Sequence, residues 1–261
     1  MVAANLDDIE SLKRAFEGAY GAFCLTNYWE HSSPEKETAQ AKTQAQAAKH
    51  ARLQHVIWSA FEDTRRWVPL SDNRMPTLMG KYQVPHFDAK AEADAGFAAL
   101  AVPTTLYLTS FYWENLINLG MGPRKDEDGK LAITLSMADK KLPGVAVDDL
   151  GKCALGIFKR GNEFIGRTVG GADEHLTGAQ MAAAVTRAFG QEVRYNAVEP
   201  ADYAKLGFPG ADDLANIFQF KRDFQSSYLG APSLSVSRTH NPDLQTFDMW
   251  LAHNKHRIPL E

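Results

Sequence analysis

Three short, largely apolar runs in the first half of the chain constrain the fold most. They are GAFCLT (residues 21–26), HVIWSA (55–60) and TTLYLT (104–109), and they resemble strands that are covered on both faces. The segments between them, residues 34–51 and 85–101, each begin with a proline at a helix start and favour helices. This alternation is typical of a parallel, doubly wound α/β sheet.

The second half of the chain has less regular patterns. We expect an edge or hairpin strand over residues 130–136 and a helix within 145–159. Further strands are predicted at 163–171 and 192–198, and helices after Thr177 and at 200–206, 211–229 and 243–254. These elements suggest a small α+β lobe joined to the sheet.

Composition argues against several classes of protein. The 261 residues carry 28 Lys+Arg and 32 Asp+Glu, a net charge of −4 without a basic block, so we expect no direct contact with nucleic acid. The apolar runs are too short or too interrupted for a membrane span. Cys24 and Cys153 lie in apolar stretches without a CxxC motif, which predicts reduced thiols in a cytoplasmic protein.

The chain lacks the best-known dinucleotide and reductase motifs. No GxGxxG occurs, and Gly18-Ala-Tyr-Gly21 follows a helical segment instead of a strand. None of the eight tyrosines has a lysine four residues later, the spacing that lowers the pKa of a catalytic phenol.

Lys90 is the best candidate for a proton-transfer residue. His86 precedes it by one helical turn, so both side chains would lie on the same side of a helix. The alternative is that Lys90 is a solvated helix residue among Asp88, Glu92 and Asp94, and that His86 belongs to the helix entry.

Other combinations of reactive residues are weaker. His253 and His256 have no acidic ligand at helical spacing, so we expect no metal site. Ser59 ends a predicted strand, but no GxSxG elbow supports a hydrolase.

Several segments, taken together and in order, resemble the NmrA-like family of atypical short-chain dehydrogenase/reductase proteins, in particular its HSCARG-type branch. They are AFCLTNYWE, HFDAKAE, FYWENL, PGVAVDDLG and PADYAKLGFPGADDLANIFQF. The resemblance implies a Rossmann-like fold that binds NADP(H) and often works as a redox sensor with a regulatory protein partner. It also implies that the tyrosine of the reductase motif is replaced, here by His86.

The resemblance assigns roles to individual residues. Lys90 corresponds to the lysine that contacts the nicotinamide-side ribose. The other positions implied to line the cofactor are Thr26, Asn27 and Tyr28 after one strand, Ser59 and Ala60 at the end of the next, and Tyr112, Glu114 and Asn115 in a segment that closes over the nicotinamide.

In this alignment the chain lacks the family's first strands and its glycine loop, roughly two strand–helix units of ~30 residues each. We therefore expect a single N-terminally truncated domain: part of a Rossmann sheet over about 1–125, and a C-terminal substrate lobe over about 126–261 with a returning strand and helix near 145–170. Such a chain would line the nicotinamide half of a site, so its binding of NADP(H) is in question.

Without the family's first strands, the strand of residues 21–26 would be an open edge of the sheet. This predicts a homodimer or a heterodimer that forms through that edge. Three functions follow as alternatives: an NAD(P)H-sensing regulatory protein, an NAD(P)H-dependent oxidoreductase with Lys90 as proton relay, and a cofactor-free interaction module. The expected location is the cytoplasm, with the nucleus as the alternative.

Overall fold

The computed structural model describes residues 2–126, 128–228 and 233–260, and the chain divides into two compact units. The first unit comprises residues 1–109 and 154–169, and the second comprises 110–153 and 170–261. The sequence placed this boundary near residue 125. The chain crosses between the units three times, so each unit is built from segments that are distant in sequence.

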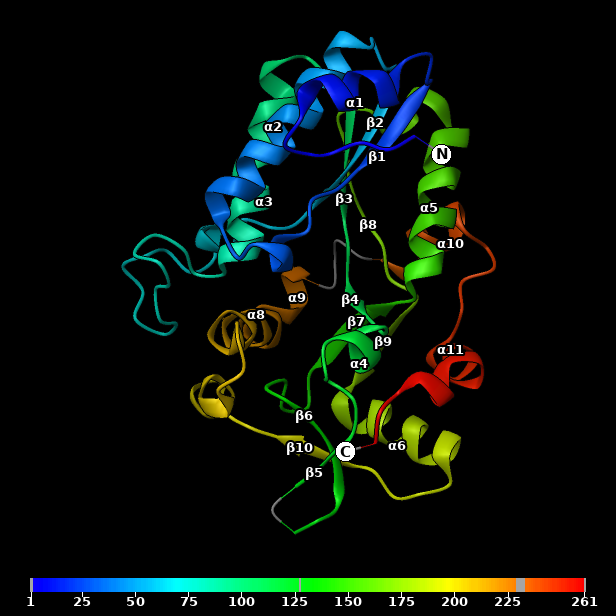
Figure 1. The fold of residues 1–261 in the computed structure, drawn as a ribbon. Coiled ribbons are helices and arrows are strands. Elements are labelled where there is room, and N and C mark those ends of the chain that lie inside the picture. The colour runs from blue at the N-terminus through cyan, green and yellow to red at the C-terminus, as the bar shows by residue number, and fades with distance from the viewer. Residues whose placement is uncertain (1, 127, 229–232, 261) are drawn as a thin grey trace. The chain divides into compact units, whose positions relative to one another are not determined.

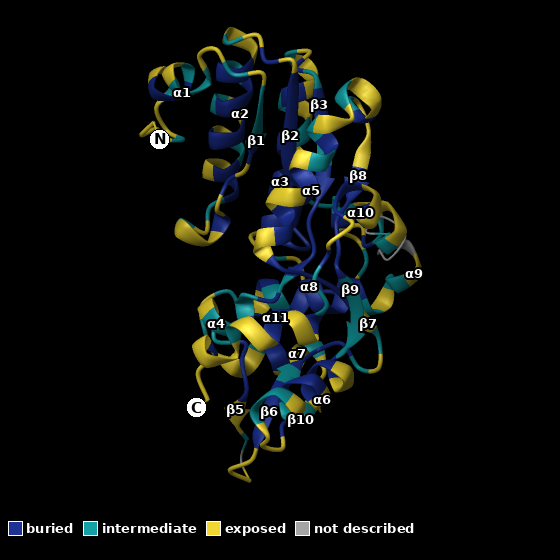
Figure 2. Cartoon of the chain, turned by 90° about the vertical axis from the view of Figure 1, so that its right-hand side faces the viewer, coloured by how far each residue is buried: buried dark blue, intermediate teal, exposed yellow. Residues whose placement is uncertain are grey.

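The first unit holds a four-stranded sheet in the order β1-β2-β3-β8 (Figure 1). β1 (Gly21–Cys24) pairs with β2 (His55–Ala60), and β2 pairs with β3 (Thr104–Leu108), all in parallel; β8 is Thr168–Gly170. All six residues of β2 are buried, as Figure 2 shows, which explains its continuous apolar sequence. The predicted parallel α/β fold is confirmed.

Helices cover both faces of this sheet. They are α1 (Ile9–Phe16), α2 (Pro34–His50), α3 (Pro85–Ala99) and the end of α5 (Val147–Lys159). Successive side chains of β2 point to opposite faces of the sheet. His55 therefore points to α5, where its ring centre lies 5.2 Å from that of Phe158, whereas Trp58 points to α3, with its ring centre 5.1 Å from that of Phe97. This is the two-sided cover of a doubly wound sheet.

Capping explains where the helices of the first unit begin. Ser33 accepts a hydrogen bond from the backbone N–H of Lys36, and Pro34 occupies the first turn, so α2 starts where the sequence predicts. Asp8 caps α1 in the same way through Glu10 N–H. A 3-10 turn, η1 (Tyr28–Glu30), lies between β1 and α2.

The second unit contains two three-stranded sheets. One has the order β10-β6-β5 and the other β4-β7-β9. The strands are β4 (Phe111–Tyr112), β5 (Arg124–Lys125), β6 (Leu131–Leu135), β7 (Lys141–Val145), β9 (Glu174–Thr177) and β10 (Arg194–Ala197). The helices are α4 (Asn115–Asn118), the first part of α5, α6 (Gly178–Phe189), α7 (Pro200–Tyr203), α8 (Ala211–Asp223), α9 (Gln225–Tyr228), α10 (Leu234–His240) and α11 (Phe247–Asn254).

The structure refines two strand predictions. β6 forms an antiparallel hairpin with β5, as the hairpin alternative for residues 130–136 expects, but it is not an edge, because β10 pairs with its other side through Arg194 and Ala132. The strand expected over 163–171 is limited to β8, since Gly166 takes a left-handed φ of 78° and residues 161–164 form a 3-10 turn. Part of the helix predicted at 211–229 falls on residue 229, which lies outside the described residues.

Candidate functional site

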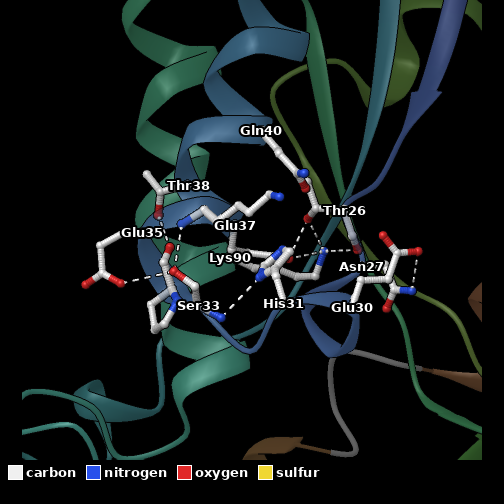
Figure 3. Close-up of polar contacts among 12 residues, drawn as sticks. Thr26, Asn27, Glu30, His31, Ser33, Glu35, Glu37, Thr38, Gln40 and Lys90 are labelled. Atoms are coloured by element: carbon white, nitrogen blue, oxygen red, sulfur yellow. Dashed lines mark hydrogen bonds and ion pairs between the residues drawn. The ribbon is translucent and has the colours of Figure 1, made fainter. Parts of the chain in front are cut away.

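A buried ammonium group organises the carboxyl end of β1. Lys90, on α3, is 4% exposed, and its Nζ donates to the Thr26 carbonyl at 3.1 Å and to Thr26 Oγ1 at 2.8 Å (Figure 3). The third neighbour is Glu37 Oε1 on α2, at 3.0 Å. The polar neighbours of the ammonium group are therefore acceptors of the chain itself.

The carboxylate of Glu37 is fully buried and serves two elements. Its Oε1 accepts from both Lys90 and the hydroxyl of Thr26, and its Oε2 lies 3.5 Å from His31 Nε2. The backbone N–H of Ser33 donates to His31 Nδ1 at 3.1 Å, so that nitrogen carries no proton and Nε2–H faces Glu37. The cluster of Thr26, His31, Glu37 and Lys90 is called the lysine cluster below.

Electrostatics in the lysine cluster balance burial against ion pairing. Burial lowers the pKa of Lys90 and the neighbouring Glu37 raises it, with the net effect downward. The ammonium also lies 4.9 Å from the Trp58 ring centre, a cation–π contact. Because the charge is paired and sheltered from water, Lys90 is not the solvated helix residue that the alternative interpretation described.

α2 positions the loop after β1 with polar side chains. Gln44, which follows Glu37 by about two helical turns, donates through Nε2 to the Leu25 carbonyl at 3.1 Å. The two side chains hold consecutive residues of the loop, Leu25 and Thr26. The sequence predicted only a helix over residues 34–51 and did not indicate this role; the available signal was polar residues recurring at the helical spacing of its buried alanines.

The other predicted residues of this loop differ in exposure. Asn27 is exposed and donates through Nδ2 to Glu30 Oε1 at 3.0 Å, whereas Tyr28 is buried. Since both follow the carboxyl end of β1, the loop presents Asn27 to solvent and anchors itself through Tyr28.

His86 occupies an aromatic pocket on α3. Its ring centre lies 5.0 Å from Trp29, 5.8 Å from Tyr28 and 5.8 Å from Phe61. Phe61 also contacts the Lys90 ammonium, at 6.0 Å from its ring centre. His86 and Lys90 thus share Phe61 as a neighbour on one side of α3.

The pleat separates Ser59 from Lys90. Residues 56, 58 and 60 of β2 face α3, so Ser59 faces the opposite side, level with Tyr107 of β3. Ala60 lies on the α3 side and is fully buried. Only Ala60 of this pair shares a face with the lysine cluster.

Two further carboxyl groups of α3 are buried or shielded. Asp88 is fully buried and accepts from the N–H groups of Thr64, Gln83 and Val84, so it closes the long loop between β2 and α3. Asp94 accepts from Trp58 Nε1 at 2.8 Å, and burial raises its pKa to about 7. The alternative interpretation of Lys90 as a solvated residue placed both carboxylates on a surface face of the helix, and both are instead buried or shielded.

Tyr112, Glu114 and Asn115 belong to the second unit. Glu114 Oε1 accepts from Trp250 Nε1 at 2.9 Å and its Oε2 accepts from Val147 N–H at 3.1 Å, so it ties α11 to the start of α5. Tyr112 is half-buried in β4, and Asn115 begins α4. Glu114 therefore has a clear structural function within its unit.

Within residues 2–126, 128–228 and 233–260, no group of three or more His, Cys, Asp or Glu side chains is arranged to hold a metal ion. In the same residues no helix has the length and apolarity that crossing a membrane requires.

Comparison with known proteins identifies the family of the chain. The model of the NmrA-like family matches residues 1–251. An NmrA-like family domain-containing oxidoreductase from Aspergillus flavus is 23% identical over 249 residues, which cover 88% of this chain and 71% of that protein.

Solved structures share the fold. The negative transcriptional regulator NmrA, in a crystal structure with NADP, superposes with a TM-score of 0.74 and 23% identity, covering 95% of this chain and 77% of that one. The NADP(H) complex of Citrobacter triphenylmethane reductase gives a TM-score of 0.69 at 14% identity and covers 96% and 81%. Because the family model spans nearly all of the 261 residues, the chain belongs to the NmrA-like family.

Proposed function

We propose that this chain is an NAD(P)H-responsive binding and regulatory protein that does not catalyse hydride transfer. The observation that carries the proposal is the enclosure of Lys90: its side chain is 6% exposed, and the polar neighbours of its Nζ are the carbonyl and hydroxyl of Thr26 and the carboxylate of Glu37. A lysine that relays a proton must direct one donor to substrate or water. Lys90 instead acts as a positioning residue that fixes the loop at Thr26.

The same geometry limits how a cofactor would be held. The Lys90 ammonium does not fit the role of a ribose donor, because its side chain is 6% exposed and its polar contacts are to Thr26 and Glu37 within the chain. Asn27 fits a polar contact better, since it is exposed in the loop that Lys90 holds. Ligands of open α/β sheets bind at the carboxyl ends of the strands, which is where this loop begins.

The family supports a nicotinamide dinucleotide as the ligand. The related regulator NmrA has been crystallised with NAD and with NADP, and NADPH-dependent quinone oxidoreductase from Escherichia coli has been crystallised with NADPH. Cys24 and Cys153 are both buried thiols, which supports a reducing compartment, the cytoplasm or the nucleus.

A titration of NADPH and NADH against the 261-residue chain by calorimetry tests the proposal. We expect saturable NADPH binding, weakened about threefold to tenfold in Asn27→Ala, the worth of one hydrogen bond. Glu35→Ala, an exposed residue of α2, is the matched control. Nicotinamide mononucleotide should compete better than 2′,5′-ADP if the loop contacts the nicotinamide half.

A turnover assay separates the alternatives. NADPH should not be oxidised faster than background with a quinone acceptor. Oxidation that Lys90→Met abolishes would identify a reductase. Absence of binding up to millimolar NADPH would leave protein contacts as the function of this chain.

We also propose that a partner chain pairs with the outer edge of β1. β1 is the last strand of its sheet in the part of the chain that the structure describes. Tyr20 and Leu25, immediately before and after it, are 53% and 47% exposed. An edge strand flanked by exposed apolar side chains is a template for pairing.

A further inference from the structure

A cavity of about 1010 Å³ lies entirely within the second unit. One face of the β10-β6-β5 sheet forms part of its lining, with the 118–122 segment and residues around α7 as walls. Its volume is at the upper end of the range for small-molecule sites. None of the residues discussed for the nicotinamide cofactor lines it.

Sheet register places two arginines on the same face of this sheet. Arg194 of β10 and Arg124 of β5 are both paired with Ala132 of β6. Residues at one register position point to the same face, so the two side chains flank a small central alanine, with their backbones about 10 Å apart, two strand spacings. Both arginines are exposed and line the cavity.

One guanidinium group lies against a glycine. A Cβ on Gly120 would lie 2.5 Å from an Nη atom of Arg124, and Gly120 has a φ of 63°. The guanidinium group therefore packs directly on the Gly120 backbone, and a side chain at this position would displace it.

The charge of the lining contrasts with that of the whole chain. Among the described residues of the lining, Arg124, Lys125 and Arg194 lie with Asp126 and Asp128, whereas the whole chain has a net charge of −4. The Asp126 carboxylate is engaged by local backbone N–H groups, those of Asp128 at 3.0 Å and Lys130 at 2.8 Å. Arg194 has an ion pair with Glu192 at 3.4 Å, but Glu192 is 72% exposed, so the pair is weak.

The lining also contains apolar side chains. Tyr203 is 2% exposed and its ring makes edge contacts with Phe208 at 5.9 Å and Phe218 at 5.3 Å. Leu119 and Leu206 add two exposed apolar side chains to the lining. The cavity thus combines a cationic floor with an aromatic and aliphatic wall.

We propose that this cavity binds a small organic anion, with its carboxylate between Arg124 and Arg194 and its flat apolar body against the wall of Tyr203 and Phe208. Arginine presents paired N–H donors that match a carboxylate, and an apolar body gains from the exposed leucines. The ligand class is an aromatic monocarboxylate or a close relative of it. The proposal is independent of cofactor binding, because every lining residue belongs to the second unit.

The test compares 2-naphthoate with 2-naphthamide, a neutral probe of nearly the same shape. Titration of the full chain, followed by naphthalene fluorescence, should show binding of 2-naphthoate that is about tenfold tighter than that of 2-naphthamide, as expected for a charge-assisted pair. Arg124→Gln and Arg194→Gln should each remove most of this preference. Gly120→Ala should weaken naphthoate binding by displacing the Arg124 side chain.

Arg187→Gln is the matched control, because Arg187 is an exposed arginine of the same unit that does not line the cavity. It should bind both probes as the unaltered chain does, and thermal unfolding should verify that each variant is folded. Equal affinity for naphthoate and naphthamide would overturn the proposal. So would a naphthoate affinity that neither arginine substitution changes.

Discussion

A carboxylate on α2 determines what Lys90 does. The lysine and its spacing from His86 are visible in the sequence, but Glu37 lies 53 residues before Lys90, and only packing of α2 against α3 brings them to 3.0 Å. A charged residue near a proline-capped helix start is ordinarily solvated, so composition gave no reason to bury it. The functional candidate was predictable at this scale, and its partner was not.

Replacing Glu37 tests this residue-scale account. Glu37→Gln removes the charge that faces a buried ammonium group, and we expect a loss of about 3–5 kcal/mol in the free energy of unfolding. Urea denaturation measures it. Glu35→Gln, whose side chain is 74% exposed, should change stability by less than about 0.5 kcal/mol.

The double variant Lys90→Met, Glu37→Gln completes a double-mutant cycle, which measures the interaction between the two side chains. It should lose less stability than the sum of the two single variants, because each single variant leaves one buried polar partner behind. Simple additivity would contradict the ion pair.

The buried carboxyl group of Asp173 should make the free energy of unfolding depend on pH. Burial, and then the nearby carboxylates of Asp149 and Glu114, raise its pKa to about 8 from the ordinary 3.8. The native state therefore binds more protons than the unfolded state between about pH 4 and pH 8, and the free energy of unfolding falls as pH rises through that window. The slope from this group is at most about 1.4 kcal/mol per pH unit.

Asp173→Asn should flatten that slope, since the amide keeps an oxygen for the N–H of Ala146, now bonded at 2.8 Å, and does not ionise. Thermal unfolding at pH 5 and pH 8 measures the change. Asp139→Asn is the control. Lys140 lowers the pKa of the exposed Asp139, so the contribution of Asp139 to the pH dependence of stability lies at pH values below about 4, outside the window of Asp173. An unchanged slope in Asp173→Asn would exclude the buried carboxyl as its source.

At the scale of elements, local chemistry was predictable and long-range pairing was not. α2 and α6 begin where Ser33 and Thr177 cap them, and Thr177 forms a complete capping box with Gln180. β7 was missed because KLPGV contains a proline and a glycine, which usually mark turns. It forms a strand because β4 and β9 pair with it, and no local pattern encodes those partners.

The edge of β1 yields the prediction at this scale. If the edge pairs with a second chain, light scattering after size-exclusion chromatography should show a mass that rises with concentration. Leu25→Lys should shift the chain to a monomer, because charges at an edge oppose strand pairing. Leu70→Lys changes a leucine of similar exposure, 46%, away from β1 and should leave the mass unchanged. A monomer at every concentration would exclude pairing through β1.

At the scale of the whole molecule, one helix, α5, contains residues of both units. α5 runs from Val147 in the second unit to Lys159 in the first, and the units divide between Cys153 and Ala154. Unwinding this helix at its middle would therefore remove native structure from both units at once. α3, by contrast, belongs to the first unit alone.

Ala154→Gly tests whether α5 couples the units. Ala154 is 3% exposed, and glycine in a helix interior costs about 1 kcal/mol relative to alanine. Hydrogen exchange should then accelerate both in β2 of the first unit and in β7 of the second. Ala98→Gly makes the same change at an exposed position of α3, and its effect should stay within the first unit. Faster exchange in only one unit of Ala154→Gly would mean that the two units open independently, despite the helix they share.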